Sequence, residues 1–142
     1  MSHPFTYLEV STILDHYLVA LVWSTTHTYM NDDGTEGETV ELDSIDATYS
    51  DNILADSRKD IENFLDTATE MLEAKGYTWD DYLNLGHDEE QIGHDFALTR
   101  NWHGAGFWDR GDGDIGDILT AASKVLGGAD AYLGDDGLIY VA

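Results

Sequence analysis

The residues best suited to chemistry are concentrated in one short stretch, residues 94–111. It holds two histidines, two aspartates, two of the three arginines, an asparagine and a threonine among bulky aromatic side chains. Residues of these types carry out acid–base catalysis when they converge in a pocket. A small hydrolase or metal-dependent enzyme is therefore one interpretation of the segment. Its candidate catalytic residues are His94, Arg100, Asn101, His103 and Asp109.

A metal site is the second chemistry that these residue types allow. Its ligands would be His94, His103 and Asp109, because imidazole and carboxylate groups bind transition metals. However, the chain has no H-E-x-x-H or P-C-x-x-C signature, and the glycines of residues 104–106 lack the lysine and spacing of a phosphate loop. Residues 109–117 lack the twelfth-position glutamate of a calcium loop. The sequence therefore predicts neither a metal nor a cofactor.

The same segment also has a structural interpretation, which we favour over recognition and over catalysis. Arg100 would pair with Asp95 or Asp109. Its guanidinium would stack on Trp102 or Trp108, and both histidines would be hydrogen-bonded within a turn. If the Trp102 ring is exposed instead, it becomes an anchor for a binding partner.

Helices and hairpins are expected to position this segment. Apolar residues at three- and four-residue spacing indicate helices, with Ser50 as a suitable N-cap and Gly76 at a C-terminus. Alternation around Asn101 and the tight-turn sequence at residues 134–137 indicate two β-hairpins. The expected helices cover residues 8–26, 51–75, 79–85 and 112–126, and the expected strands cover 94–99, 104–109, 129–133 and 138–141. Residues 40–45 are a further strand or an extended connection, and residues 31–39 and 86–93 are loops.

These elements predict an α+β fold within a single domain over residues 1–142. Two N-terminal helices would form a helical part at about 8–85, and a ββαββ part would follow at about 93–142. The four strands would form one antiparallel sheet covered by helices on one face. The length of 142 residues and a hydrophobic content of 42% are sufficient for one buried core.

Charge excludes several classes of function. The chain has 29 acidic and 6 basic residues, and its formal net charge is -23. Direct binding to nucleic acid or to an anionic membrane requires a basic surface, so neither is expected. There is no cysteine, which excludes disulfides and thiol chemistry. With no signal peptide or membrane-length apolar run visible, we expect a cytoplasmic protein.

Two explanations of the acidity remain open. Carboxylates can adapt a surface to high salt or to solubility, or they can imitate DNA phosphates and occupy a partner's nucleic-acid groove. The second explanation points to the acids of the long helix at residues 51–75. Subsets of these acids share a face at three- and four-residue spacing. The acids are Asp56, Asp60, Glu62, Asp66, Glu70 and Glu73, with Trp102 as a further contact.

Residues 94–111 resemble the core of a family of small acidic proteins carried by bacteriophages, prophages and plasmids. The pattern in this family is H-D-F-x-L-T-R-N-x-H-G-A-G-F-W-D-R-G, and the likeness continues loosely into residues 131–140. The resemblance implies a phage accessory protein in a host cytoplasm and implies no particular chemistry. We therefore expect a non-enzymatic protein that binds and antagonises or modulates a host protein that handles DNA or RNA. The alternatives are the small hydrolase or metal enzyme described above, and an accessory module whose acidity is salt adaptation.

Overall fold

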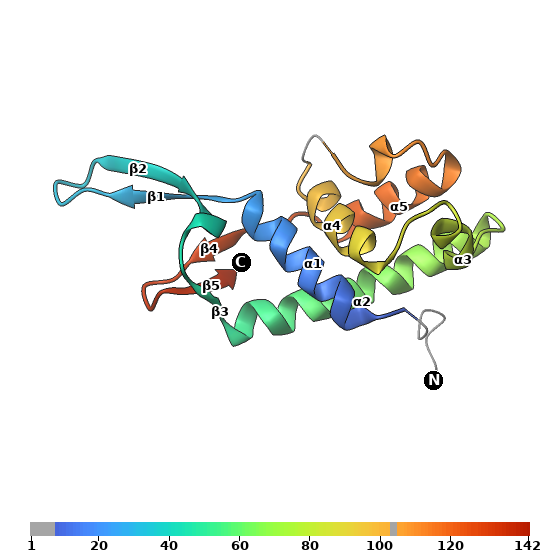
Figure 1. Ribbon diagram of the computed structural model, residues 1–142, viewed down its shortest axis with the longest axis horizontal. Helices are drawn as coiled ribbons and strands as arrows, with labels where there is room; N and C mark the ends of the chain where they lie inside the picture. Colours follow the sequence, from blue (N-terminus) through green and yellow to red (C-terminus); the bar gives the residue numbers. More distant parts are fainter. Residues whose placement is uncertain (1–7, 103–104) are drawn as a thin grey trace.

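The longest element, α2 (Asp51–Ala74), forms where apolar spacing predicted it. This computed structural model describes residues 8–102 and 105–142. The Oγ of Ser50 accepts a hydrogen bond from the Ile53 backbone N–H at 3.2 Å, which confirms the predicted N-cap. Gly76 follows the helix with φ at +82°, a conformation that glycine adopts without strain. At 1.5 Å per residue α2 is about 36 Å long, and it runs along one side of the molecule (Figure 1).

Residues 94–99 are helical, so the predicted hairpin at 94–109 is wrong. They belong to α4 (Glu89–Arg100), which begins inside the predicted loop at 86–93. The Asp88 carboxylate caps this helix by accepting a hydrogen bond from the Gln91 backbone N–H at 3.0 Å. Ile92 and Phe96, one turn apart, are both fully buried. The imperfect alternation of polar and apolar residues therefore reflects a helix buried on several sides.

A glycine allows α4 to pack closely against α1 (Val10–Trp23). A Cβ atom at Gly93 would collide with the Ile13 carbonyl oxygen and would lie 2.8 Å from the Tyr17 backbone nitrogen. The two helix backbones approach one another at this point, which fixes the position of the segment that follows α4. Figure 1 shows α4 lying beside α1 in the middle of the molecule.

The remaining helices agree with the sequence. The capping box of α3 joins Thr78 and Asp81, and the predicted short turn at 79–85 is confirmed. The helix predicted at 112–126 is also present, and Gly127 follows it with φ at +71°. The bounds are α3 (Trp79–Leu83), the 3₁₀ turn η2 (Phe107–Asp109) and α5 (Asp114–Val125).

The strands form two small sheets rather than one antiparallel sheet of four strands. The predicted C-terminal hairpin is confirmed as β4 (Ala131–Leu133) and β5 (Leu138–Val141). β3 (Thr48–Tyr49) pairs parallel with β5, giving the order β3-β5-β4. This pairing places the start of α2 beside the C-terminal strand.

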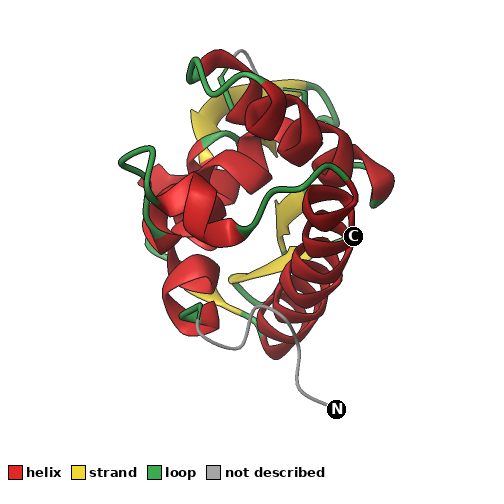
Figure 2. Ribbon diagram, turned by 90° about the vertical axis from the view of Figure 1, so that its right-hand side faces the viewer, coloured by secondary structure: helices red, strands yellow, loops and turns green. Residues whose placement is uncertain are grey.

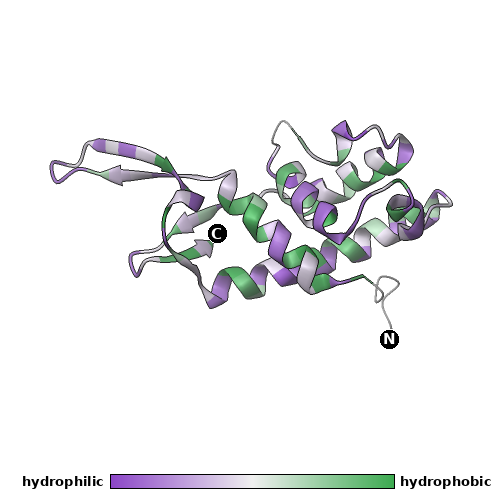
Figure 3. Cartoon of the chain, viewed as in Figure 1, coloured by the Kyte–Doolittle hydropathy of each residue, from purple (hydrophilic) through white to green (hydrophobic). Residues whose placement is uncertain are grey.

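The second sheet is a hairpin where mostly loop was expected. β1 (Thr26–Met30) pairs antiparallel with β2 (Glu36–Glu41), and the turn η1 (Leu42–Ser44) follows. No residue of either strand is buried, so neither shows the alternation by which a half-buried strand is recognised. Figure 1 shows this hairpin projecting away from the helices, and Figure 3 shows that β2 is mostly hydrophilic or neutral, with a hydrophobic segment near its end.

Aromatic rings from several helices make the centre of the core. The Phe64 ring of α2 stacks on Phe96 of α4 with centroids 4.2 Å apart, and Phe107 lies 5.8 Å from Phe64. Tyr17 of α1 contacts Phe96 at 5.3 Å. Figure 2 shows the helices grouped into the main body of the molecule, with strands lying behind them. The α+β class is thus confirmed, and the predicted ββαββ order of residues 93–142 is wrong in its first half.

Within the part of the chain that the structure describes, no helix combines the length and apolar character needed to cross a membrane.

Candidate functional site

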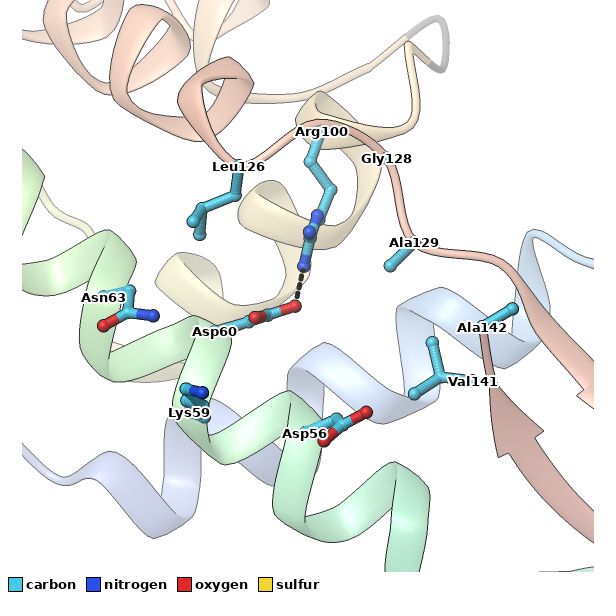
Figure 4. Close-up of a pocket in the computed structure, with 10 residues that line it drawn as sticks. All are labelled: Asp56, Lys59, Asp60, Asn63, Arg100, Leu126, Gly128, Ala129, Val141 and Ala142. Atoms are coloured by element: carbon cyan, nitrogen blue, oxygen red, sulfur yellow. Dashed lines mark hydrogen bonds and ion pairs between the residues drawn. The ribbon is translucent and has the colours of Figure 1, made fainter.

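Arg100, at the end of α4, connects three helices through its guanidinium group. Its Nη1 donates to Asp60 Oδ2 at 2.8 Å and to the Tyr17 hydroxyl at 3.0 Å, and its Nε donates to the Gly127 carbonyl at 2.9 Å. The guanidinium also lies 5.1 Å from the centre of the Phe96 ring. Only 2% of the Arg100 side chain is exposed. Figure 4 shows Arg100 reaching across to Asp60 on α2.

The predicted partners of Arg100 are wrong, because another arginine takes Asp95. Arg110 binds the fully buried Asp95 carboxylate with Nη2–Oδ1 at 2.7 Å and Nε–Oδ2 at 3.1 Å. The Gln91 side-chain amide donates to the same carboxylate at 2.9 Å. The hydrogen bond to Asp95 raises the pKa of Arg110, so the cation is held charged. The Arg110–Asp95 pair fastens the end of the 94–110 segment to the middle of α4.

The side chains of Asn101 and Thr99 hold two other segments of the chain against the end of α4. The Asn101 side chain accepts a hydrogen bond from the Ala129 N–H at 2.8 Å and donates one to the Ala129 carbonyl at 2.9 Å. The Thr99 hydroxyl accepts a hydrogen bond from the Phe107 N–H at 3.1 Å. A Cβ at Gly106 would collide with this hydroxyl, so the loop requires a glycine at this position in order to close.

The four catalytic candidates that the structure describes do not form a common site. Arg100 and Asn101 bind groups of their own chain, and Asp109 accepts a hydrogen bond from the Gly106 N–H at 3.0 Å. His94 is half-buried on α4, six residues from Arg100, which corresponds to a rise of about 9 Å and a rotation of about 120° away from it. His103 lies outside the described residues. The hairpin that would have brought these side chains together is absent.

A metal-binding group is not found among the described residues. No three His, Cys, Asp or Glu side chains in residues 8–102 and 105–142 are arranged so that they could hold an ion. Of the three predicted ligands, the structure describes His94 and Asp109 but not His103.

Two tryptophans of the segment are exposed. The relative exposure of Trp102 is 74% and that of Trp108 is 51%. Trp102 is also the only described non-glycine residue with positive φ, at +60°. The Lys124 ammonium lies 3.7 Å from the centre of the Trp102 ring. The expected stacking of Arg100 on these rings is not found. The Trp102 ring is exposed, which was the condition for its role as an anchor, and that role remains a prediction.

Trp102 lines two surface cavities. One has a volume of about 240 Å³ and is shared with Thr99, Trp108, Thr120 and Lys124. The other, of about 400 Å³, is lined on different sides by the ends of α1, α4 and α5 and includes Asp130. A third cavity, of about 420 Å³, lies beyond Arg100 and is lined by Asp56, Lys59 and Asp60 of α2. Figure 4 shows this third cavity, with α2 forming one of its walls.

The six acids proposed on α2 spread over one sector of about 160° on the side of the helix opposite its buried residues. With 100° per residue, Glu62, Asp66, Glu70 and Glu73 fall within about 80°, and Asp56 and Asp60 lie about 40° and 80° beyond Glu70. Asp60 is the counter-ion of Arg100, so its charge is already neutralised. Glu62 lies 3.7 Å from Arg58 in an exposed pair. The stripe considered below is Glu62, Asp66, Glu70 and Glu73, of which Glu70 and Glu73 are exposed and the other two are half-buried.

Several residues of this network were not identified from the sequence. Tyr17 and Gly127 were not assigned any polar role, and Asp60 was assigned a surface role only. Their partner Arg100 is separated from Tyr17 by 83 residues and from Asp60 by 40 residues. No local pattern reports such contacts. An arginine inside an apolar stretch was the available signal that a buried anion had to exist.

Comparison with protein-family models, with curated proteins and with solved structures finds no match.

Proposed function

We propose that this chain is a non-enzymatic acidic binding protein. Its ligand is a basic surface on a protein that handles nucleic acid, and its carboxylates occupy the groove that phosphates would fill. The resemblance of residues 94–111 to phage-borne proteins makes a bacterial host protein the expected partner, with the phage benefiting from its inhibition or modulation.

The observation that carries this proposal is the separation of the two charge types. Carboxylates are exposed over the whole described surface, apart from the buried Asp95 and five that are half-buried. Most basic side chains, in contrast, are occupied within the protein: Arg58, Arg100, Arg110 and Lys124 each contact a group of their own chain. The surface field is therefore negative, and it attracts a cationic surface from a distance while repelling DNA.

The shape of α2 supports the choice of this helix as the binding surface. A straight helix about 36 Å long is as long as one turn of B-DNA, which repeats after about 34–36 Å. The stripe from Glu62 to Glu73 places four carboxylates along about 17 Å of its exposed side. A groove that accepts a phosphate strand can accept such a row of anions.

The polar residues of the 94–110 segment support a binding role over catalysis. Arg100, Asn101 and Asp109 form intramolecular hydrogen bonds, which stabilise the folded chain. The segment thus supports the shape of the molecule and presents Trp102 and Trp108 to solvent.

A competition experiment tests the proposal. The immobilised chain is incubated with bacterial lysate at physiological ionic strength, and bound proteins are challenged with duplex DNA or with uncharged dextran. We expect a nucleic-acid-binding protein to be retained in stoichiometric amount and released by DNA alone. Retention of no such protein, or release by both additives alike, would overturn the proposal and leave the acidity as salt adaptation.

A further inference from the structure

Trp102 has a backbone conformation and an exposure that do not favour a tryptophan for the stability of the fold. Its φ of +60° lies in the left-handed region, which is unfavourable for residues that have a Cβ atom. The ring is 74% exposed, so little of this energetic cost is recovered by burial. Strain at an exposed aromatic residue is more typical of a binding site than of a structural element.

Hydrogen bonds fix the backbone that carries Trp102. The residue before it, Asn101, is joined to Ala129 by two hydrogen bonds of 2.8 and 2.9 Å. The turn is closed by a hydrogen bond of 3.1 Å from the Trp102 N–H to the Thr99 carbonyl. A residue whose backbone is fixed before binding loses less conformational entropy on binding than one in a mobile segment.

The protein itself shows what kind of group this ring binds. The ammonium of Lys124 lies 3.7 Å from the ring centroid, which is a cation–π contact. Lys124 and Trp102 line the same cavity of about 240 Å³. The second cavity that Trp102 lines, of about 400 Å³, contains no free cation among the described residues, because its Arg100 is paired with Asp60.

This second cavity contains a carboxylate without a partner. Asp130 is exposed, and its side chain has no hydrogen bond or ion pair with any of the described residues. Its backbone carbonyl accepts a hydrogen bond from the Ala142 N–H at 3.0 Å, which holds the residue in place. An aromatic face beside an anion is the environment that a guanidinium prefers, because that group stacks on rings and binds a carboxylate through two N–H groups.

We propose that Trp102 and Asp130 form a receptor for the guanidinium group of an arginine side chain on the basic partner. This inference rests on the proposed function and adds a specific contact to the general attraction of the acidic surface. The guanidinium enters the cavity of about 400 Å³, stacks on the indole and donates two hydrogen bonds to Asp130. The overall charge of -23 raises the local concentration of such cationic side chains.

Nuclear magnetic resonance titration tests this receptor with a defined probe. The chain has four tryptophans, at positions 23, 79, 102 and 108, whose indole N–H signals can be assigned by Trp→Phe variants. The probes are the blocked tripeptide Gly-Arg-Gly and its counterpart with neutral citrulline. We expect a saturable shift of the Trp102 signal with the arginine peptide only, and no shift of the signal of the buried Trp79.

Matched variants separate the receptor from general electrostatics. Asp130→Asn and Asp135→Asn remove the same charge, and Asp135 is an exposed residue of the β4–β5 turn. We expect Asp130→Asn and Trp102→Leu each to weaken arginine-peptide binding by roughly fivefold or more, and Asp135→Asn to leave it unchanged. Equal effects of the two aspartate variants, or equal binding of the citrulline peptide, would overturn the inference.

Failure of the Trp102–Asp130 receptor can be distinguished from failure of the proposed function. If Trp102→Leu and Asp130→Asn still retain the DNA-releasable partner at full strength, the receptor is wrong and the acidic-surface proposal stands. If no such partner exists, the proposed function falls regardless of the peptide titration.

Discussion

Arg100 and Asp60 form an ion pair across the helical core, with Nη1 and Oδ2 2.8 Å apart. The two partners differ in burial, since 2% of the arginine side chain and 31% of the aspartate side chain are exposed. The cation also binds Tyr17 and the Gly127 carbonyl. One buried guanidinium thus connects α1, α2, α4 and the segment after α5.

Removal of this guanidinium is predicted to destabilise the fold strongly. Arg100→Met leaves the Tyr17 hydroxyl and the Gly127 carbonyl without their donor, and we expect a loss of about 3 kcal/mol in the free energy of unfolding. Asp60→Asn keeps an acceptor oxygen and is half-exposed, so we expect about 1 kcal/mol. Urea denaturation measures both. The control is Arg58→Met, which breaks the exposed pair with Glu62 at 3.7 Å. A loss from Arg100→Met no larger than this control's would contradict the account.

Asn101 is predicted to be a stability residue and not a catalytic one. Asn101→Ala removes both hydrogen bonds to Ala129, and we expect a loss of about 1–3 kcal/mol. Asn101→Asp should be at least as damaging, because it places a carboxylate oxygen against the Ala129 carbonyl. Thermal and urea unfolding give the values. If both variants are as stable as the parent protein, the structural assignment is wrong.

Two buried tyrosines are predicted to respond in opposite ways to loss of the hydroxyl. The Tyr82 hydroxyl is buried and has no hydrogen-bond partner among the described residues, whereas the Tyr17 hydroxyl accepts a hydrogen bond from Arg100 at 3.0 Å. Tyr82→Phe therefore removes an unsatisfied polar group and should be neutral or stabilising by about 1 kcal/mol, and Tyr17→Phe should destabilise by about the same amount. Urea denaturation at neutral pH compares them. A destabilised Tyr82→Phe would indicate a partner for this hydroxyl.

Alkaline pH is predicted to weaken the fold through the same two residues. Burial is the largest influence on both phenols and raises the pKa of Tyr17 and of Tyr82 above the ordinary value. The folded state therefore favours the protonated phenols. Their contribution to stability is complete at pH values below about 10, the pKa of a tyrosine in the unfolded chain. This contribution is lost as the pH rises above that value. Tyr82→Phe should reduce the slope of stability against pH in this range, and an unchanged slope would show that folding does not raise the pKa of Tyr82.

The sequence predicted the elements whose signals are local. α2 was recognised from the Ser50 cap, its apolar spacing and Gly76, and the β4–β5 hairpin from its turn residues. The prediction from the sequence failed for α4. Burial on several sides removes the amphipathic pattern of this helix, and residues 94–99 are left with an alternation that resembles a strand by chance. The prediction also failed for β1 and β2 because neither strand buries a face.

The candidate site was predicted only in part, for the same reason. Trp102 was expected to be an anchor if exposed, and it is exposed. The partners of Arg100 and the parallel pairing of β3 with β5 join residues far apart in the chain, and only the tertiary fold brings them together.

Salt is predicted to stabilise the protein. Carboxylates repel one another over most of the surface at low ionic strength, and the Debye length falls from about 30 Å at 0.01 M to about 10 Å at 0.1 M salt. Unfolding temperature should therefore rise over this interval of sodium chloride. An unfolding temperature that stays constant or falls as salt is added would mean that repulsion between the carboxylates does not destabilise the fold at low ionic strength.

The central claim is that the carboxylate row on α2 is the surface that binds a basic partner. The most direct measurement compares retention of the DNA-releasable partner by two variants that each lose four charges. One variant carries Gln or Asn at Glu62, Asp66, Glu70 and Glu73 of α2, and the other carries them at Asp32, Glu36, Glu38 and Glu41 of the β1–β2 hairpin. We predict that the α2 variant loses the partner and that the hairpin variant retains it. Equal retention by both variants would contradict the claim.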